Sequence, residues 1–110
     1  AVMDPAEIAT ARPIRKSVID KMNAMLADDA ILVLPTVPGI APLRATPDAT
    51  LDVFRARAIE MLCVAGHAGV PQLSMPVATL DDCPIGLSIM GARDCDEDLL
   101  ALAVAFAGKA

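Results

Sequence analysis

Prolines and glycines divide this sequence into short segments, and they constrain its fold more than any other feature. The 110 residues include nine prolines and six glycines, which favour turns and the ends of helices and strands. The densest cluster, AGHAGVPQLSMP at 65–76, contains two glycines, two prolines and the only histidine. Two interpretations of this stretch are open: an active-site loop, or the connection between a helix and a strand.

The first third of the chain predicts two helical pieces and a strand. The segment DPAE at 4–7 has the form of a capping box with proline at the first helical position, and a short helical turn is expected after it. Pro13 is expected to interrupt that turn and to begin an amphipathic helix that ends near Asp28. The run AILVLPT at 30–36 then predicts an apolar strand buried on both faces, as in a parallel or mixed sheet.

The remaining elements follow from helical spacing, apolar alternation and turn residues. In chain order they are a loop at 37–47, a helix at 50–65, strands at 72–78 and 85–92, and a helix that begins in the acidic segment 94–98. Gly66 and Gly69 both suit the end of the middle helix, and Gly66 is expected to end it. The order helix, strand, helix, strand, strand, helix predicts an α/β fold with a mixed β-sheet covered by helices.

Composition limits the class of protein. Hydrophobic residues make up 55% and charged residues 21% of the chain, which excludes a disordered acidic tail. So much apolar surface exceeds what a small domain buries, so we expect either an oligomer or a piece of a larger protein. The net charge of −5 and the presence of only two aromatic residues argue against binding to nucleic acid.

The apolar runs and the cysteines indicate where in the cell the protein is located. No apolar run is long enough to span a bilayer, and the sequence opens without a signal-peptide pattern, so no membrane association is expected. The three cysteines are widely spaced and odd in number, which argues against a disulfide framework. A reducing, cytoplasmic location is therefore expected.

The sequence contains no complete catalytic or metal-binding set. Cys63 and His67 are four residues apart, but a zinc site needs further ligands, and no CxxC or HxxxH pattern supplies them. Cys63 lies near the C-terminal end of its helix, whereas catalytic cysteines favour the N-terminal end, so it is interpreted as a small buried apolar residue. The acidic residues at 94–98 lack the glycine and glutamate of an EF-hand loop and are interpreted as helix capping. No serine lies in a GxSxG or SxxK pattern.

Three segments, in order and at matching separations, resemble the C-terminal part of the amidase signature enzymes. DDAILVLPTVPGIAP resembles the family's strand that ends in Pro-Thr, with the loop that follows it. AGHAGVPQLSMPVA resembles its Gly-x-Pro stretch, and CPIGLSIMGARDCDEDLL resembles its closing strand and acidic helix start. The segment 55–78 is similar to the indole-acetamide-hydrolase-like branch and to the amidase-like region of a chloroplast import receptor.

The resemblance implies a fold, a reaction and an incomplete domain. Residues 1–110 would form the C-terminal segment of one amidase domain, within a larger α/β/α fold. Such enzymes hydrolyse a carboxamide to a carboxylate and ammonia or an amine, using a serine, a second serine after a cis peptide bond, and a lysine, with no metal or organic cofactor. None of the three serines and three lysines here matches those motifs. The triad is therefore expected in a missing N-terminal part, and the segment alone is expected to be inactive. The segment is also expected to associate with itself or with that missing N-terminal part.

The resemblance also implies roles for individual residues. Under it, 66–76 is a helix-to-strand connection, and His67 takes no part in chemistry. Thr36 and Val37 follow the end of a buried strand, where ligands of α/β proteins gather, and are the expected wall of a pocket for a small-molecule amide. No catalytic residue and no metal ligand is assigned. Two alternatives remain open: a noncatalytic amidase-like interaction or scaffold module, and a small enzyme that uses Cys63 with His67.

Overall fold

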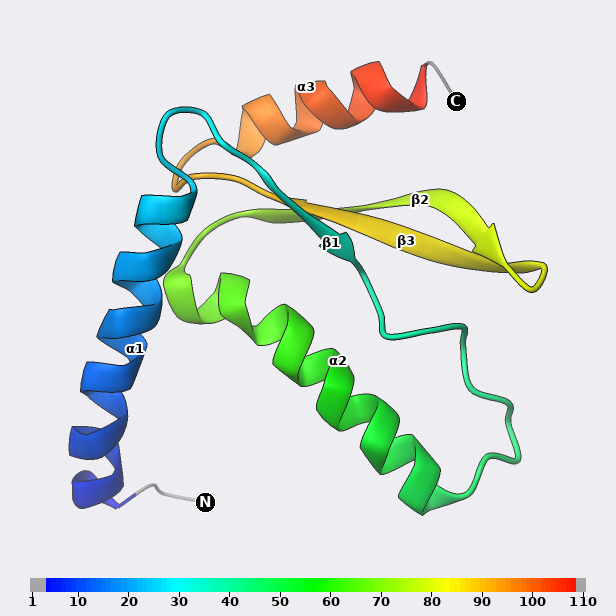
Figure 1. Ribbon diagram of the computed structural model, residues 1–110, viewed down its shortest axis with the longest axis horizontal. Helices are drawn as coiled ribbons and strands as arrows, with labels where there is room; N and C mark the ends of the chain where they lie inside the picture. Colours follow the sequence, from blue (N-terminus) through cyan, green and yellow to red (C-terminus); the bar gives the residue numbers. More distant parts are fainter. Residues whose placement is uncertain (1–3, 109–110) are drawn as a thin grey trace.

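The computed structural model describes residues 4–108 and has helices on both faces of a three-stranded sheet (Figure 1). Helices α1 and α2 lie on one face, and α3 lies on the other. The predicted α/β class and the predicted order of elements are confirmed. That order is α1 (Pro5–Met25), β1 (Leu32–Pro35), α2 (Asp48–Ala68), β2 (Gln72–Leu80), β3 (Cys83–Met90) and α3 (Asp96–Ala107).

Helix α1 begins at the predicted capping box. The Asp4 carboxylate accepts a hydrogen bond from the amide of Ala6 at 3.0 Å. The Glu7 carboxylate accepts one from the amide of Asp4 at 3.3 Å. The expected interruption at Pro13 is wrong, because one helix continues through it to Met25. Proline removes a single amide donor, and the carbonyl left without that donor lies in an exposed stretch of α1, where water can bond to it.

The strand order is β1-β3-β2, and both outer strands pair antiparallel with β3. Strands β1 and β2 therefore run in the same direction, with α2 connecting them and β3 lying between them. Among the described residues every pair of neighbouring strands is antiparallel. The sheet is mixed only in the sense that its two outer strands run in the same direction. The register shifts once, between Pro76 and Ala78, which leaves Val77 as the extra residue of a β-bulge.

The prediction that β1 is buried on both faces is wrong. Its residues alternate between half-buried and exposed, and 49% of the Val33 surface is exposed. The reason is the position of the strand at the edge of the sheet, because α3 packs beside β2 at the opposite edge. The outward face of β1 is therefore left without a helix among the described residues.

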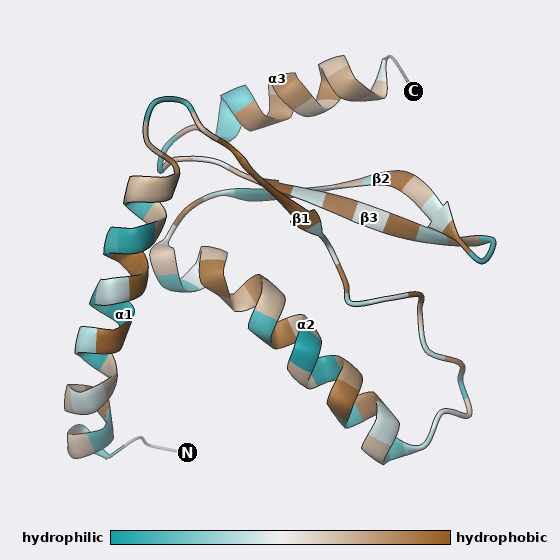
Figure 2. Ribbon diagram, viewed as in Figure 1, coloured by the Kyte–Doolittle hydropathy of each residue, from teal (hydrophilic) through white to brown (hydrophobic). Residues whose placement is uncertain are grey.

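Two apolar clusters hold the layers together. Figure 2 shows the hydrophobic residues concentrated in the strands and in α3. The buried residues of the first cluster join α1, α2 and the sheet, and they are Met22, Leu26, Ala65, Ala68, Val70 and Met90. Those of the second join the other face of the sheet to α3, and they are Met75, Ile89 and Leu99. Each cluster is small, and most of α1 and α2 lies outside both of them.

Helix α2 extends beyond its predicted end at Gly66 and finishes at Ala68. Gly69 ends it in the left-handed conformation, with φ of 69°. The amides of Gly69 and Val70 donate hydrogen bonds to the carbonyl of Ala65 at 2.8 and 3.1 Å, which caps the last turn. The stretch 65–76 is therefore a helix-to-strand connection, since it consists of the end of α2, three linking residues and the start of β2.

The arrangement is open. The radius of gyration is 16.6 Å, whereas a compact domain of this size has a value of about 13 Å. Large apolar side chains are exposed on several elements, including Ile14 on α1, Ile59 on α2 and Val104 on α3. Within residues 4–108, no helix combines the length and apolar character required to cross a membrane.

The two glycines at the end of α2 provide a matched pair of substitutions. Gly69→Ala should lower the free energy of unfolding by about 1–2 kcal/mol, because an alanine is strained in the left-handed conformation. Gly66→Ala should be neutral or raise it by up to about 1 kcal/mol, because Gly66 is helical and open space surrounds the added Cβ. Urea unfolding measures both. Equal effects of the two variants would contradict the capping role of Gly69.

Candidate functional site

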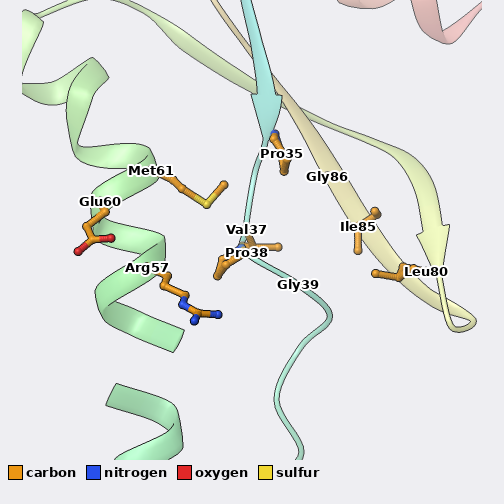
Figure 3. Close-up of a pocket in the computed structure, with 10 residues that line it drawn as sticks. All are labelled: Pro35, Val37, Pro38, Gly39, Arg57, Glu60, Met61, Leu80, Ile85 and Gly86. Atoms are coloured by element: carbon orange, nitrogen blue, oxygen red, sulfur yellow. The ribbon is translucent and has the colours of Figure 1, made fainter. Parts of the chain in front are cut away.

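The site forms where β1 ends and its following loop faces α2. Val37, Pro38 and Gly39 run across one side of a hollow of about 480 Å³. Its other walls come from α2, from the end of β1 and from the β2–β3 hairpin (Figure 3). They are formed by Pro35, Arg57, Glu60, Met61, Leu80, Ile85 and Gly86. The volume lies within the range of small-molecule sites.

Thr36 and Val37, the two predicted pocket residues, take different positions. Val37 lines the hollow. Thr36 does not, because its hydroxyl contacts Ser74 Oγ at 2.7 Å and Ser88 Oγ at 3.0 Å. Its backbone amide also donates to the carbonyl of Gly86 at 2.9 Å, which continues the β1–β3 ladder by one residue. A role for either residue in substrate binding stays a prediction.

Thr36, Ser74 and Ser88 form a hydroxyl cluster across the three strands. Ser88 is completely buried, whereas Ser74 is exposed. The cluster lies beside Gly86, where an added Cβ would come within 2.6 Å of Thr36 Oγ1 and 2.8 Å of Ser74 Oγ. A glycine is therefore required here by close packing, not by backbone conformation. The cluster gives the sheet a polar patch on the face shared with α2.

Sequence reasoning missed this cluster and did not assign Arg57 to a site. Arg57 and Met61 are one turn apart on α2, a spacing that places them on the same side of the helix. That spacing was available in the sequence, but the loop that faces them could not be located from it. The pairing of Ser74 with Ser88 also depends on the bulge in β2.

Cys63 and His67 do lie on one helix, contrary to the expected end at Gly66. Cys63 is half-buried, and His67 is exposed. The backbone carbonyl of His67 accepts a hydrogen bond from Arg15 Nε at 3.1 Å, which ties α1 to α2. In residues 4–108, no group of three histidine, cysteine or acidic side chains is arranged to hold a metal ion.

Cys95 lies where α3 begins, within the acidic segment 94–98. Its Sγ donates to the carbonyl of Ala92 at 2.8 Å. Burial raises the pKa of this thiol, and the nearby carboxylates of Asp98 and Asp96 raise it further. The thiolate is the nucleophilic form, so the surroundings of Cys95 oppose nucleophilic catalysis.

Sequence comparison relates this chain to known proteins. The chain is 33% identical over 91 residues to Amidase 1 of Arabidopsis thaliana, a match that covers 83% of this chain and 21% of that protein. It is 37% identical over 87 residues to Amidase 1 of Oryza sativa, covering 79% of this chain and 20% of that protein. It is also 33% identical over 79 residues to the chloroplastic outer envelope protein 64 of Arabidopsis thaliana, covering 72% of this chain and 13% of that protein. No protein-family model matches.

Solved structures give the same result for the fold. A bacterial aryl acylamidase of the amidase signature family superposes with a TM-score of 0.75 at 24% identity, covering 96% of this chain and 23% of that one. The crystal structure of a second amidase superposes with a TM-score of 0.75 at 21% identity, covering 97% of this chain and 26% of that one.

The layered α/β fold and the matched amidases define the class of protein. By sequence and by fold the chain is related to the amidase signature proteins, of which it matches a part. The chain spans about a fifth of the length of the amidases that it matches.

The hydroxyl cluster predicts a difference between two substitutions. Thr36→Val should lower the free energy of unfolding by about 1–3 kcal/mol, because it leaves the buried Ser88 hydroxyl without its partner. Ser74→Ala should change it by less than about 0.5 kcal/mol, because Ser74 is exposed and Thr36 keeps its contact with Ser88. Urea unfolding of both variants tests this, and a neutral Thr36→Val would show that the buried hydroxyl does not need Thr36.

The environment of Cys95 predicts slow alkylation. At pH 8 its reaction with iodoacetamide should be slower than that of a cysteine in an unstructured peptide, because a raised pKa lowers the thiolate fraction. The rate should increase as the pH rises through 9. Asp98→Asn should increase the rate at pH 8, because it removes a carboxylate that raises the pKa. Mass spectrometry of the Cys95 peptide measures the rate, and a rate equal to that of the peptide control would contradict the shift.

Proposed function

We propose that the complete polypeptide that carries this segment is an amidase, which hydrolyses a small carboxamide to a carboxylate and ammonia or an amine. The supporting observation is similarity to proteins named amidase over most of this chain. The resemblance of 55–78 to the indole-acetamide-hydrolase-like branch remains part of this proposal. Small aryl-acetamides are therefore the substrates to test first.

The catalytic serine, the second serine and the lysine are proposed to lie outside this chain. Among the described residues, the hydroxyls of Ser74 and Ser88 contact Thr36, whereas Lys16 pairs with Asp20. Lys109 lies outside the described residues. In these contacts neither Ser74 nor Ser88 has a partner that could act as its base. Without a base, a serine is not activated as the nucleophile of acyl transfer. The segment alone is therefore proposed to be inactive.

The segment's proposed role is to complete the domain and to form one wall of the substrate pocket. Val37 lines the hollow, and Thr36 fixes the strand end beside it. The exposed apolar side chains and the large radius of gyration support packing against the N-terminal part of the same domain, or against a second copy. Its three free cysteines support a reducing compartment, and we propose the cytoplasm.

A second candidate function is a noncatalytic interaction module. The similarity to outer envelope protein 64, a protein that is not named as an amidase, favours it, at 33% identity over 79 residues. The two candidates differ in the remainder of the polypeptide, because only an amidase needs both serines and the lysine there.

Hydrolysis of phenylacetamide tests the proposal. The complete polypeptide should release ammonia from it, and the 110-residue chain alone should release none, because the nucleophile and base are absent from this chain. A coupled assay of ammonia release measures the activity, and peptide sequencing of the complete polypeptide shows whether it contains the two serines and the lysine. Turnover by the 110-residue chain that is lost in Ser74→Ala would overturn the location of the triad. A complete polypeptide without activity and without the triad would favour the interaction module.

A further inference from the structure

The hollow between α2 and the loop after β1 contains a cation that forms no ion pair with any residue in 4–108. Arg57 lines it, and Figure 3 shows the guanidinium directed toward Val37 and Pro38. The ion pairs in the described part of the chain are Lys16–Asp20 and Arg55–Asp52, so Arg57 takes part in neither. Glu60 also borders the hollow, but its carboxylate points away from the guanidinium in Figure 3.

The walls facing Arg57 are mostly apolar. Met61 extends from α2 toward the loop, and Pro35 and Ile85 approach from the sheet (Figure 3). Leu80 closes the side formed by the hairpin. The hollow therefore combines an apolar surface with two charged lining residues: Arg57, whose guanidinium faces the loop, and Glu60, whose carboxylate points away from that guanidinium (Figure 3). Small-molecule sites have this composition, in which apolar contacts supply affinity and a few polar groups fix orientation.

We infer that this hollow binds a small apolar carboxylate, with Arg57 as its anchoring cation. The planar guanidinium donates two parallel hydrogen bonds to a carboxylate, a geometry that a lysine ammonium does not offer. A phosphate is a poorer occupant, because it is more strongly hydrated and finds no second cation among the lining residues. The volume of about 480 Å³ accommodates an aryl or short alkyl group attached to the carboxylate.

This assignment of ligand class rests on the proposed amidase function, because hydrolysis of an apolar amide releases an apolar carboxylate. The site would then discriminate the charged product from its neutral amide. Arg57 is a binding residue here and has no role in bond breaking. Because the side chain is exposed, water screens its charge, and the expected effects are moderate.

Calorimetric titration of the complete polypeptide with 3-phenylpropionate tests the inference. The neutral analogue 3-phenylpropan-1-ol, which keeps the apolar group and lacks the charge, is the second probe. Arg57→Gln should weaken binding of the carboxylate about tenfold, the effect of losing a charge-assisted hydrogen bond, and should leave the alcohol unchanged. Arg55→Gln is the matched control, because Arg55 lies on the same helix but pairs with Asp52 outside the hollow. It should change neither affinity.

Unchanged carboxylate affinity in Arg57→Gln, or no saturable binding to the wild type, overturns the inference. If Arg57→Gln does not fold, Arg57→Lys decides, since it keeps the charge and loses the two-point geometry. Arg57→Lys should weaken binding of the carboxylate by a smaller factor than Arg57→Gln. The NMR chemical shift of the Met61 methyl group during the titration gives a second measurement. An unchanged chemical shift also counts against this site. Amide hydrolysis without carboxylate binding would overturn this inference alone, whereas binding without hydrolysis would overturn the amidase proposal alone.

Discussion

The single extra residue in β2 sets the register on which the sheet depends. From the hairpin turn at Asp81 and Asp82 back to Ala78, each residue of β2 pairs with the residue of β3 that lies equally far from the turn. If that pairing continued, Ser74 would face Ile89 and Met75 would face Ser88. The bulge at Val77 shifts the pairing by one, so that Ser74 meets Ser88 and Met75 meets Leu87. A shift of one residue exchanges the two faces of a strand. This shift places Met75 on the apolar face under α3 and Ser74 on the face toward α2.

The candidate site follows from that register. With Ser74 and Ser88 on the same face, Thr36 at the end of β1 bonds to both hydroxyls, and Gly86 leaves room for the contact. The end of β1 is thereby fixed against β3, and the chain continues from it as the loop that faces α2 across the hollow. Val37 consequently lines the hollow on the side facing Arg57. A polar cluster within the sheet thus positions an apolar pocket wall beside it.

The two apolar clusters are small for the number of residues that they organise. Helix α1 contacts α2, while most of the length of α2 stands away from the sheet in Figure 1. This openness agrees with a chain that spans about a fifth of the amidases it matches. In such a segment the local structure is set by caps, turns and register, because the long-range packing available within residues 4–108 is limited.

The sequence by itself determined the α/β class, the order of elements and the family, because caps, turn residues and three motif segments are local patterns. It located the capping box at Asp4 and placed Val37 beside a strand end. It failed at Pro13 and Gly66, because the cost of a proline or glycine in a helix is decided by the packing and solvation of each position. Only the tertiary structure decided the bulge, the hydroxyl cluster and the position of Arg57 opposite the loop. These depend on contacts between segments distant in sequence, such as Thr36 with Ser88, which no local pattern encodes.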